Sequence, residues 1–226
     1  MATASEARGS SRSWVDRRVG LFGLVALVAL AIGVAVFVFQ LIPRDPGEDS
    51  AEAGFLRDMS EHHLQAVEMA LIIHDRTGDE ELGYLTTDIA LTQNSQVGTM
   101  QGWLDVWDLS PNGEDPPMTW MDHPITEGRM PGMAAPDEVE RLRTIPVDQA
   151  EVLFLQLMIR HHQGGVAMAE ALLERSDQPQ VTRLARSIVA AQRSEIEAMN
   201  QMLQQRGQPP ITDPLPADND HTEHDG

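Results

Sequence analysis

Cysteine is absent from this sequence, and so is lysine, because every basic side chain is an arginine. Without cysteine there is no disulfide, no thiolate nucleophile and no thiolate metal site. A metal ion must therefore be bound by histidine, methionine, carboxylate or backbone oxygen. Aromatic residues are also scarce, at 4%, whereas β-sandwiches are rich in aromatic and β-branched residues. The abundance of alanine, leucine and methionine favours helices instead.

Positive charge is in short supply, since the formal net charge is −19. Residues 45–226 carry 11 arginines against 33 acidic residues, whereas the first 18 residues carry four arginines. An acidic domain repels nucleic acid and anionic lipid and attracts cations. We therefore expect no nucleic-acid partner. A solvated surface on a secreted domain explains the same charge equally well.

One long hydrophobic run lies near the N-terminus. Residues 19–42 contain no charge over 24 positions, and about 20 such residues cross a bilayer as a helix. The positive-inside rule then predicts a cytoplasmic basic tail at residues 1–18 and an extracytoplasmic remainder. A cleaved signal peptide is the alternative, but its apolar region is usually about 7–15 residues long. We expect an uncleaved single-pass anchor in the cell membrane.

The rest of the chain reads as two helical hairpins, because apolar residues recur at helical spacing. The expected divisions are a linker at 43–50, a first hairpin at 51–109, a methionine-rich crossover at 110–147, a second hairpin at 148–206 and a disordered acidic tail at 207–226. Two hairpins joined by one long crossover predict a duplicated bundle at 51–206. The fold class is all-α, a ferritin-like four-helix bundle preceded by one transmembrane helix.

Local signals set the expected helix ends. Ser50 is expected to cap the first helix and Asp148 the third. Gly78 suits the left-handed position after the end of the first helix. Pro179 fits the first turn of the fourth helix, which is expected to stop at Gly207.

The two hairpins repeat one motif at an offset of 99 residues. Residues 55–70 read FLRDMSEHHLQAVEMA and residues 154–169 read FLQLMIRHHQGGVAMA. At 100° per residue, one stripe of each helix carries a histidine flanked by methionines. His62 and His161 should point most directly inward. His63 and His162 should be offset toward a neighbouring helix.

The repeated histidines and methionines are candidate metal ligands. They are His62, His63, His161, His162, Met59, Met69, Met158 and Met168. Neutral imidazole and thioether together suit copper, and thioether sulfur favours the cuprous ion. The alternative is that the methionines fill the core and the histidines are ordinary hydrogen-bonded core residues.

The crossover adds further candidate ligands for a soft cation. They are Met118, Met121, His123, Met130 and Met133. A mobile methionine-rich lid could accept or hand over a soft cation. Packing over the open face of the bundle explains the same methionines equally well.

The second helix of each hairpin offers polar side chains that could hydrogen-bond the imidazoles. They are Gln93, Gln96, Gln192 and Glu195, of which only Glu195 is anionic. A di-iron site needs Glu on two helices and Glu-x-x-His on the other two. No Glu-x-x-His lies on the bundle helices, so the sequence disfavours iron redox chemistry. Gly164 and Gly165 indicate a close helix crossing beside His161.

These motifs resemble a known family. The F-L-x-x-M-x-x-H-H-x-x-x-V-x-M-A signature, the M-P-G-M linker and the I-x-x-x-Q-x-x-E-I-x-x-M helix are similar to the domain of unknown function 305 family over about residues 51–206. The resemblance implies a ferritin-like bundle in an exported bacterial protein, and some members are associated with copper. Ser60, Glu61 and Gln96 depart from the family pattern, so the second half matches it better.

The sequence therefore favours a membrane-anchored, extracytoplasmic protein that binds copper or another transition metal and sequesters or delivers it. We expect binding rather than catalysis, with a metal-delivery partner or a homodimer as further expectations. One alternative is a metal-dependent oxidoreductase of ferritin-like type. The other is a metal-free interaction or pH-sensing module, in which the histidines act as a packing or protonation switch.

Overall fold

The computed structural model describes residues 27–34, 37 and 45–212, and the chain divides into two compact units, Met1–Asp45 and Pro46–Gly226. In the first unit, residues 27–34 and 37 are helical and their large apolar side chains are exposed. Among the described residues, no helix is long and apolar enough to cross a bilayer. Most of the predicted anchor at 19–42 and all of the basic tail lie outside the described residues.

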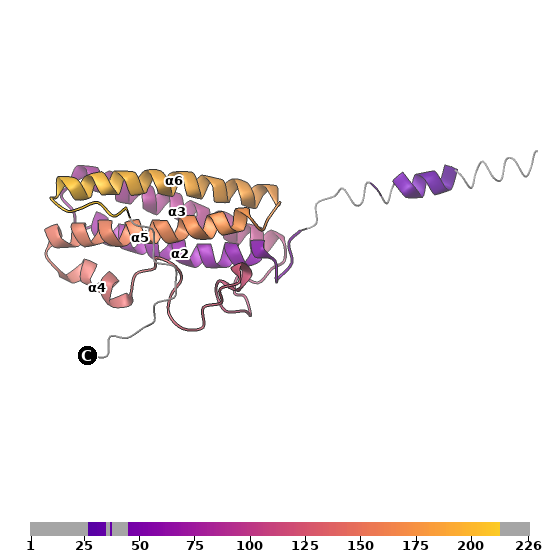
Figure 1. The fold of residues 1–226 in the computed structure, drawn as a ribbon, viewed down its shortest axis with the longest axis horizontal. Coiled ribbons are helices and arrows are strands. Elements are labelled where there is room, and N and C mark those ends of the chain that lie inside the picture. The colour runs from indigo at the N-terminus through magenta and orange to yellow at the C-terminus, as the bar shows by residue number, and fades with distance from the viewer. Residues whose placement is uncertain (1–26, 35–36, 38–44, 213–226) are drawn as a thin grey trace, which may run out of the picture. The chain divides into compact units, whose positions relative to one another are not determined.

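The second unit is helical, without strands, over its described residues, which confirms the predicted all-α class. Its elements are α2 (Ala51–His74), α3 (Glu80–Val106), the 3-10 turn η1 (Thr119–Met121), α4 (Pro136–Thr144), α5 (Val147–Leu173) and α6 (Pro179–Gln205). The four long helices lie side by side (Figure 1). Helix α2 packs against α3, α5 packs against α6, and α2 and α5 pack against each other.

The sequence repeat is also a structural repeat. Helices α3 and α6 are both 27 residues long and begin at Glu80 and Pro179, positions 99 apart. Helices α2 and α5 end at His74 and Leu173, again 99 apart. Equivalent residues of the two halves therefore occupy equivalent helical positions.

Three of the expected helix ends are confirmed and two are wrong. Ser50 caps α2 by accepting a backbone N–H at 3.2 Å, Pro179 lies in the first turn of α6, and Gly207 adopts the left-handed φ of 72° behind α6. Asp148 does not cap α5, which begins one residue earlier, at Val147, so its carboxylate lies in the first turn. Gly78 is not left-handed, because α2 has already ended at His74 with Asp75 as its C-cap; Asp79 caps the start of α3.

The apolar core is divided into two clusters. One contains Phe55, Met59, Met100, Met168 and Ile188; the other contains Met69, Ile89, Phe154, Met158 and Met199. The N-terminal half of α2 thus shares a cluster with the C-terminal half of α5, and the opposite halves share the other. The two helices are therefore antiparallel, and their midpoints lie between the clusters.

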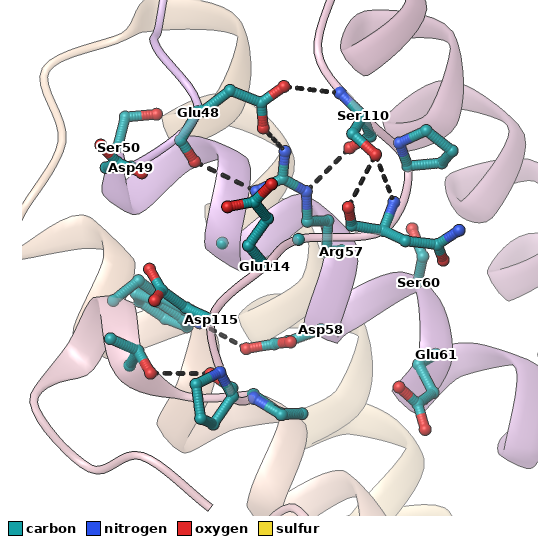
Figure 2. Close-up of a pocket in the computed structure, with 18 of the residues that line it drawn as sticks. Glu48, Asp49, Ser50, Arg57, Asp58, Ser60, Glu61, Ser110, Glu114 and Asp115 are labelled. Atoms are coloured by element: carbon teal, nitrogen blue, oxygen red, sulfur yellow. Dashed lines mark hydrogen bonds and ion pairs between the residues drawn. The ribbon is translucent and has the colours of Figure 1, made fainter.

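The crossover between the hairpins is fastened along α2. Asp58, which is only 7% exposed, accepts hydrogen bonds from the Met118 N–H at 2.7 Å and from the Trp120 indole N–H at 2.8 Å. Gln65 exchanges two hydrogen bonds with the backbone of Ala134, at 2.7 and 3.1 Å. Arg57 donates to the Ser110 carbonyl at 2.8 Å (Figure 2). Buried and half-buried polar groups of one helix thereby hold a segment that has little regular structure of its own.

Candidate metal centre

Four histidines lie in the layer between the two apolar clusters. His62, His63, His161 and His162 are all fully buried, with exposed fractions of 0%. The rings of His62 and His161 lie next to each other, with centroids 3.8 Å apart and planes inclined by 38°. The expectation that these two histidines point inward is confirmed. We call these four side chains, with Gln93, Gln96, Gln192 and Glu195, the histidine layer.

The other two histidines face the outer helices. His63 Nε2 lies 2.8 Å from Gln96 Oε1 on α3, and His162 Nε2 lies 2.5 Å from Glu195 Oε2 on α6. Because both partner atoms are oxygens that accept, each Nε2 carries the proton and donates it. The lone pair of each neutral imidazole is then on Nδ1, which has no hydrogen-bond partner.

His62 and His161 differ in their surroundings. His62 Nε2 donates to the Pro131 carbonyl at 3.0 Å, which again leaves the lone pair on a buried, unpartnered Nδ1. Neither ring nitrogen of His161 makes a hydrogen bond of ordinary geometry. The sequence did not indicate Pro131 as a partner of His62. Its only signal was the position of the M-P-G-M segment.

The glycines beside His161 are explained by the crossover and by one side chain rather than by a helix crossing. A Cβ on Gly164 would lie 1.9 Å from the Pro131 carbonyl oxygen, and one on Gly132 would lie 2.3 Å from the Arg160 carbonyl oxygen. A Cβ on Gly165 would lie 2.5 Å from Gln192 Oε1. The prediction of a close helix crossing is therefore wrong at Gly164. The crossover reaches His62 because α5 has no side chain there.

Burial keeps His62, His63 and His161 neutral. Loss of solvation lowers the pKa of His62 to about 4 and that of His63 to about 3, from an ordinary value of 6.5. Burial also holds the pKa of His161 well below its ordinary value, and the neighbouring histidines add to the effect. The uncharged form, which has a lone pair to offer a metal ion, is the stable one at neutral pH.

The histidine layer contains an unusual number of polar atoms without partners. Among the described residues, nine buried side-chain nitrogen and oxygen atoms make no hydrogen bond, and all nine belong to the four histidines, Gln93 and Gln192. The expected hydrogen bonds from Gln93 and Gln192 to histidine are therefore absent. Gln96 and Glu195 are the side chains of this group that do contact an imidazole.

The methionines of the repeat border the histidine layer on both sides. The side chains of Met59, Met69, Met158 and Met168 are fully buried. Met59 and Met168 belong to one apolar cluster, and Met69 and Met158 belong to the other. The arrangement agrees with core packing and also places thioethers on either side of the imidazoles.

The candidate residues of the crossover are less uniform. Met118 and Met130 are buried, and Met121 and Met133 are half-buried against the same apolar cluster as Met59. His123 is exposed, so it does not belong to the histidine layer. The packing interpretation accounts for the position of these methionines, and their role as ligands stays a prediction.

Carboxylates do not gather around the buried histidines. Within the part of the chain that the structure describes, no three His, Asp or Glu side chains are grouped so as to hold a metal ion. The acidic side chains instead line an open groove of about 1100 Å³ between α2 and the crossover. Figure 2 shows Glu48, Asp58, Glu61, Glu114 and Asp115 around it. No histidine or methionine lines this groove.

Solved structures resemble this chain over most of its length. A DUF305 protein from Streptomyces coelicolor, assigned as secreted, is 50% identical with a TM-score of 0.69, covering 74% of this chain and 100% of its own. A DUF305 fragment from Deinococcus radiodurans is 38% identical with a TM-score of 0.60, covering 72% and 99%.

A third structure is of CopM in a Cu(II)-bound form, at 25% identity with a TM-score of 0.51, covering 69% of this chain and 97% of CopM. No curated protein sequence matches this chain. The family model of the domain of unknown function DUF305 matches residues 52–203. The chain therefore belongs to the DUF305 family.

Proposed function

We propose that this protein binds a soft metal ion, copper above all, in the histidine layer, and that it sequesters or delivers the ion. The observation that carries the proposal is the confinement of all nine unpartnered buried polar atoms of the described residues to this layer. Each such atom costs about 1–3 kcal/mol of stability. An ion bound there would satisfy the lone pairs among these atoms.

The tautomers of the histidines support this function. In His62, His63 and His162, Nε2 donates to an oxygen atom. Metal-binding histidines commonly donate one ring N–H to a carbonyl or carboxylate and bind the ion through the other nitrogen. Here that other nitrogen is Nδ1 in each case.

The choice of a soft ion follows from the available donors. The layer offers imidazole nitrogen and, on both sides, methionine sulfur, whereas carboxylates, the ligands of hard ions, are nearly absent from it. CopM provides independent support, since it has been solved in Cu(II)-bound and Ag-bound forms at 25% identity to this chain. The methionines complete the proposed ligand set, because the histidines alone do not form a preorganised site.

We further propose that the metal-binding unit is extracytoplasmic and anchored by residues 19–42. The support is the uncharged run of 24 residues, the exposed apolar side chains at residues 27–34 and 37, and the secreted assignment of the relative from Streptomyces. Protease treatment of intact cells should digest residues 46–226 while leaving cytoplasmic markers whole. Protection of that segment until the cells are lysed would contradict the proposed topology.

Metal loading of the purified full-length chain tests the function. The wild type, the His62→Ala/His161→Ala variant and the His123→Ala control would each be loaded with Cu(I), desalted and analysed for bound copper. We expect the wild type and the His123→Ala control to retain copper and the double variant to lose it. His123 is a matched control because it is an exposed histidine. Equal retention by all three proteins would contradict the proposed site.

A further inference from the structure

The two halves of the histidine layer differ by one charge. At the offset of 99 residues, Gln96 and Glu195 are equivalent positions. Each side chain accepts a hydrogen bond from the Nε2 atom of the histidine in its own hairpin, at 2.8 Å for Gln96 and 2.5 Å for Glu195. The two side chains are nearly identical in shape. The difference between these two hydrogen bonds is therefore electrostatic.

Glu195 has no arginine partner. Its carboxylate is only 13% exposed, and among the described residues its single ion-pair partner is His162. Glu151, whose side chain is equally exposed, is paired with Arg206 instead, and the buried Asp58 accepts two hydrogen bonds from N–H groups. Burying a carboxylate is costly unless an opposite charge accompanies it. A cation bound to the neighbouring imidazole would supply that charge.

The remaining groups that contact the histidines are neutral. His62 and His63 donate to the Pro131 carbonyl and the Gln96 carboxamide. The pair of His63 and Gln96 therefore adds no charge. Glu195 is the one carboxylate hydrogen-bonded to the four histidines within the described residues. One ion of charge +1 would make the layer neutral, whereas a divalent ion or a second ion would leave a buried positive charge.

We infer that Glu195 acts as the counter-charge of the bound ion, so that the histidine layer selects a single monovalent soft cation over divalent ions. Glu195 is a positioning residue that acts through His162, because its carboxylate orients and polarises the imidazole that binds the ion. This inference rests on the proposed function and names the charge and number of the ions that the layer takes. Gln96 marks the half that lacks this counter-charge.

Exchanging the two equivalent side chains tests the inference. Four full-length proteins would be compared at pH 7: the wild type, Glu195→Gln, Gln96→Glu and the exchange variant Gln96→Glu/Glu195→Gln. Competition titrations would give their affinities for Ag(I), a monovalent soft ion that does not change oxidation state, and for Zn(II). The exchange variant keeps the total charge of the layer and moves only the carboxylate.

We expect Glu195→Gln to weaken Ag(I) binding about 10- to 100-fold. The exchange variant should recover most of that loss, because the counter-charge is again present beside a histidine. Gln96→Glu carries two carboxylates and should shift the preference between Zn(II) and Ag(I) toward Zn(II) by about tenfold or more. A purely structural role of Glu195 would not be rescued by a carboxylate in the other hairpin.

Unchanged Ag(I) affinity in Glu195→Gln would overturn the inference, as would an exchange variant that binds as poorly as Glu195→Gln. Thermal unfolding of each metal-free variant identifies any that does not fold. If Glu195→Gln is unfolded, the exchange variant and Gln96→Glu decide the question. A wild type that binds neither ion would instead contradict the proposed function, so the two failures are distinguishable.

Discussion

At the scale of single residues, identical histidines acquire different properties from their neighbours. His62 and His161 occupy equivalent positions and their rings are 3.8 Å apart. His62 nevertheless donates to Pro131 while His161 makes no hydrogen bond of ordinary geometry. The cause lies on α5, where Gly164 stands in the position that Gln65 occupies on α2. The crossover binds to one helix and rests on the bare backbone of the other.

The unpartnered carboxamide of Gln192 gives a first prediction. Both of its polar atoms are buried without hydrogen bonds, so Gln192→Met, which keeps the shape and removes the polar atoms, should stabilise the metal-free protein by about 1–3 kcal/mol. Urea unfolding measures the change. Gln201→Met is the control, since Gln201 is exposed and its change should stay within about 0.5 kcal/mol. A loss of stability in Gln192→Met would mean that the carboxamide has a partner in solution.

The buried histidines give a second prediction, on acid stability. The folded chain holds His62 and His63 neutral, with pKa values of about 4 and about 3, while the ordinary value is 6.5. Protons therefore bind preferentially to the unfolded chain between these values. The free energy of unfolding of the metal-free protein should be greatest above pH 6.5 and fall toward pH 4, by about 1.4 kcal/mol per pH unit for each histidine.

Urea unfolding at several pH values checks this prediction. His63→Gln should reduce the slope between pH 6 and 4, because one of the neutral histidines is gone. His123→Gln should leave the slope unchanged, since His123 is exposed. A flat stability profile in the wild type would show that the histidines are solvated in the folded state.

Sequence reasoning found the histidines but not all of their partners. Helical periodicity is sufficient to place His62 inward and His63 toward α3, because both follow from 100° per residue. The same rule brings Gln96 and Glu195 to the imidazoles, since each sits on the neighbouring helix. Helical periodicity says nothing about Pro131, because this residue lies in an irregular segment held by tertiary contacts. The partner of His62 was therefore not predictable.

At the scale of elements, the crossover segment is the least regular and the most informative. It is hydrogen-bonded to α2 through Asp58 and Gln65, and it packs against α5 at Gly164. Burial raises the pKa of Asp58, and the hydrogen bonds from Met118 and Trp120 oppose that shift. The segment thus covers the histidine layer where α2 and α5 meet.

Two glycine substitutions test this packing. Gly164→Ala would place a Cβ 1.9 Å from the Pro131 carbonyl oxygen, so the crossover must move, at a cost of about 1–3 kcal/mol. Gly98→Ala is the control, because Gly98 is also helical and a Cβ there meets nothing within 4 Å. It should stabilise the protein by about 0.5–1 kcal/mol. Equal stabilisation by both substitutions, measured by urea unfolding, would show that the crossover does not rest on Gly164.

Helix ends were predictable where a side chain or glycine defines them, as Ser50 and Gly207 do. They were not predictable where the helix boundary lies away from such a signal, as it does at Gly78, which follows the end of α2 at His74, and at Asp148, which lies in the first turn of α5. Pro146 is the N-cap residue of α5, and its fixed φ is compatible with a helix that starts directly behind it. That feature overrode the expected cap at Asp148.

At the scale of the whole molecule, duplication explains why a polar layer lies in the middle of an apolar bundle. Each hairpin contributes the same histidine pair, and the antiparallel arrangement of α2 and α5 brings the pairs together between two apolar clusters. An all-α class and a four-helix arrangement follow from periodicity and from the repeat. The hydrogen bonds that hold the crossover, and the buried polar atoms that lack a partner, depend on packing, which one sequence does not reveal.

Metal binding should stabilise the whole bundle. An ion that binds only the folded state adds about 2.7 kcal/mol at a free concentration of 100 times its Kd. Ag(I) should therefore raise the Tm of the wild type and leave that of His62→Ala/His161→Ala unchanged. Thermal scans with and without the ion check this. An equal rise in both proteins would place the ion elsewhere.

The most direct test of the central claim is a titration of the full-length chain, labelled with ¹⁵N at histidine, with Ag(I). We predict that one equivalent shifts the Nδ1 resonances of His62, His63 and His162 while their Nε2 atoms stay protonated. The resonances of exposed His74 and His123 should not move. Shifts confined to the exposed histidines, or no shifts at all, would contradict a soft-metal site in the histidine layer.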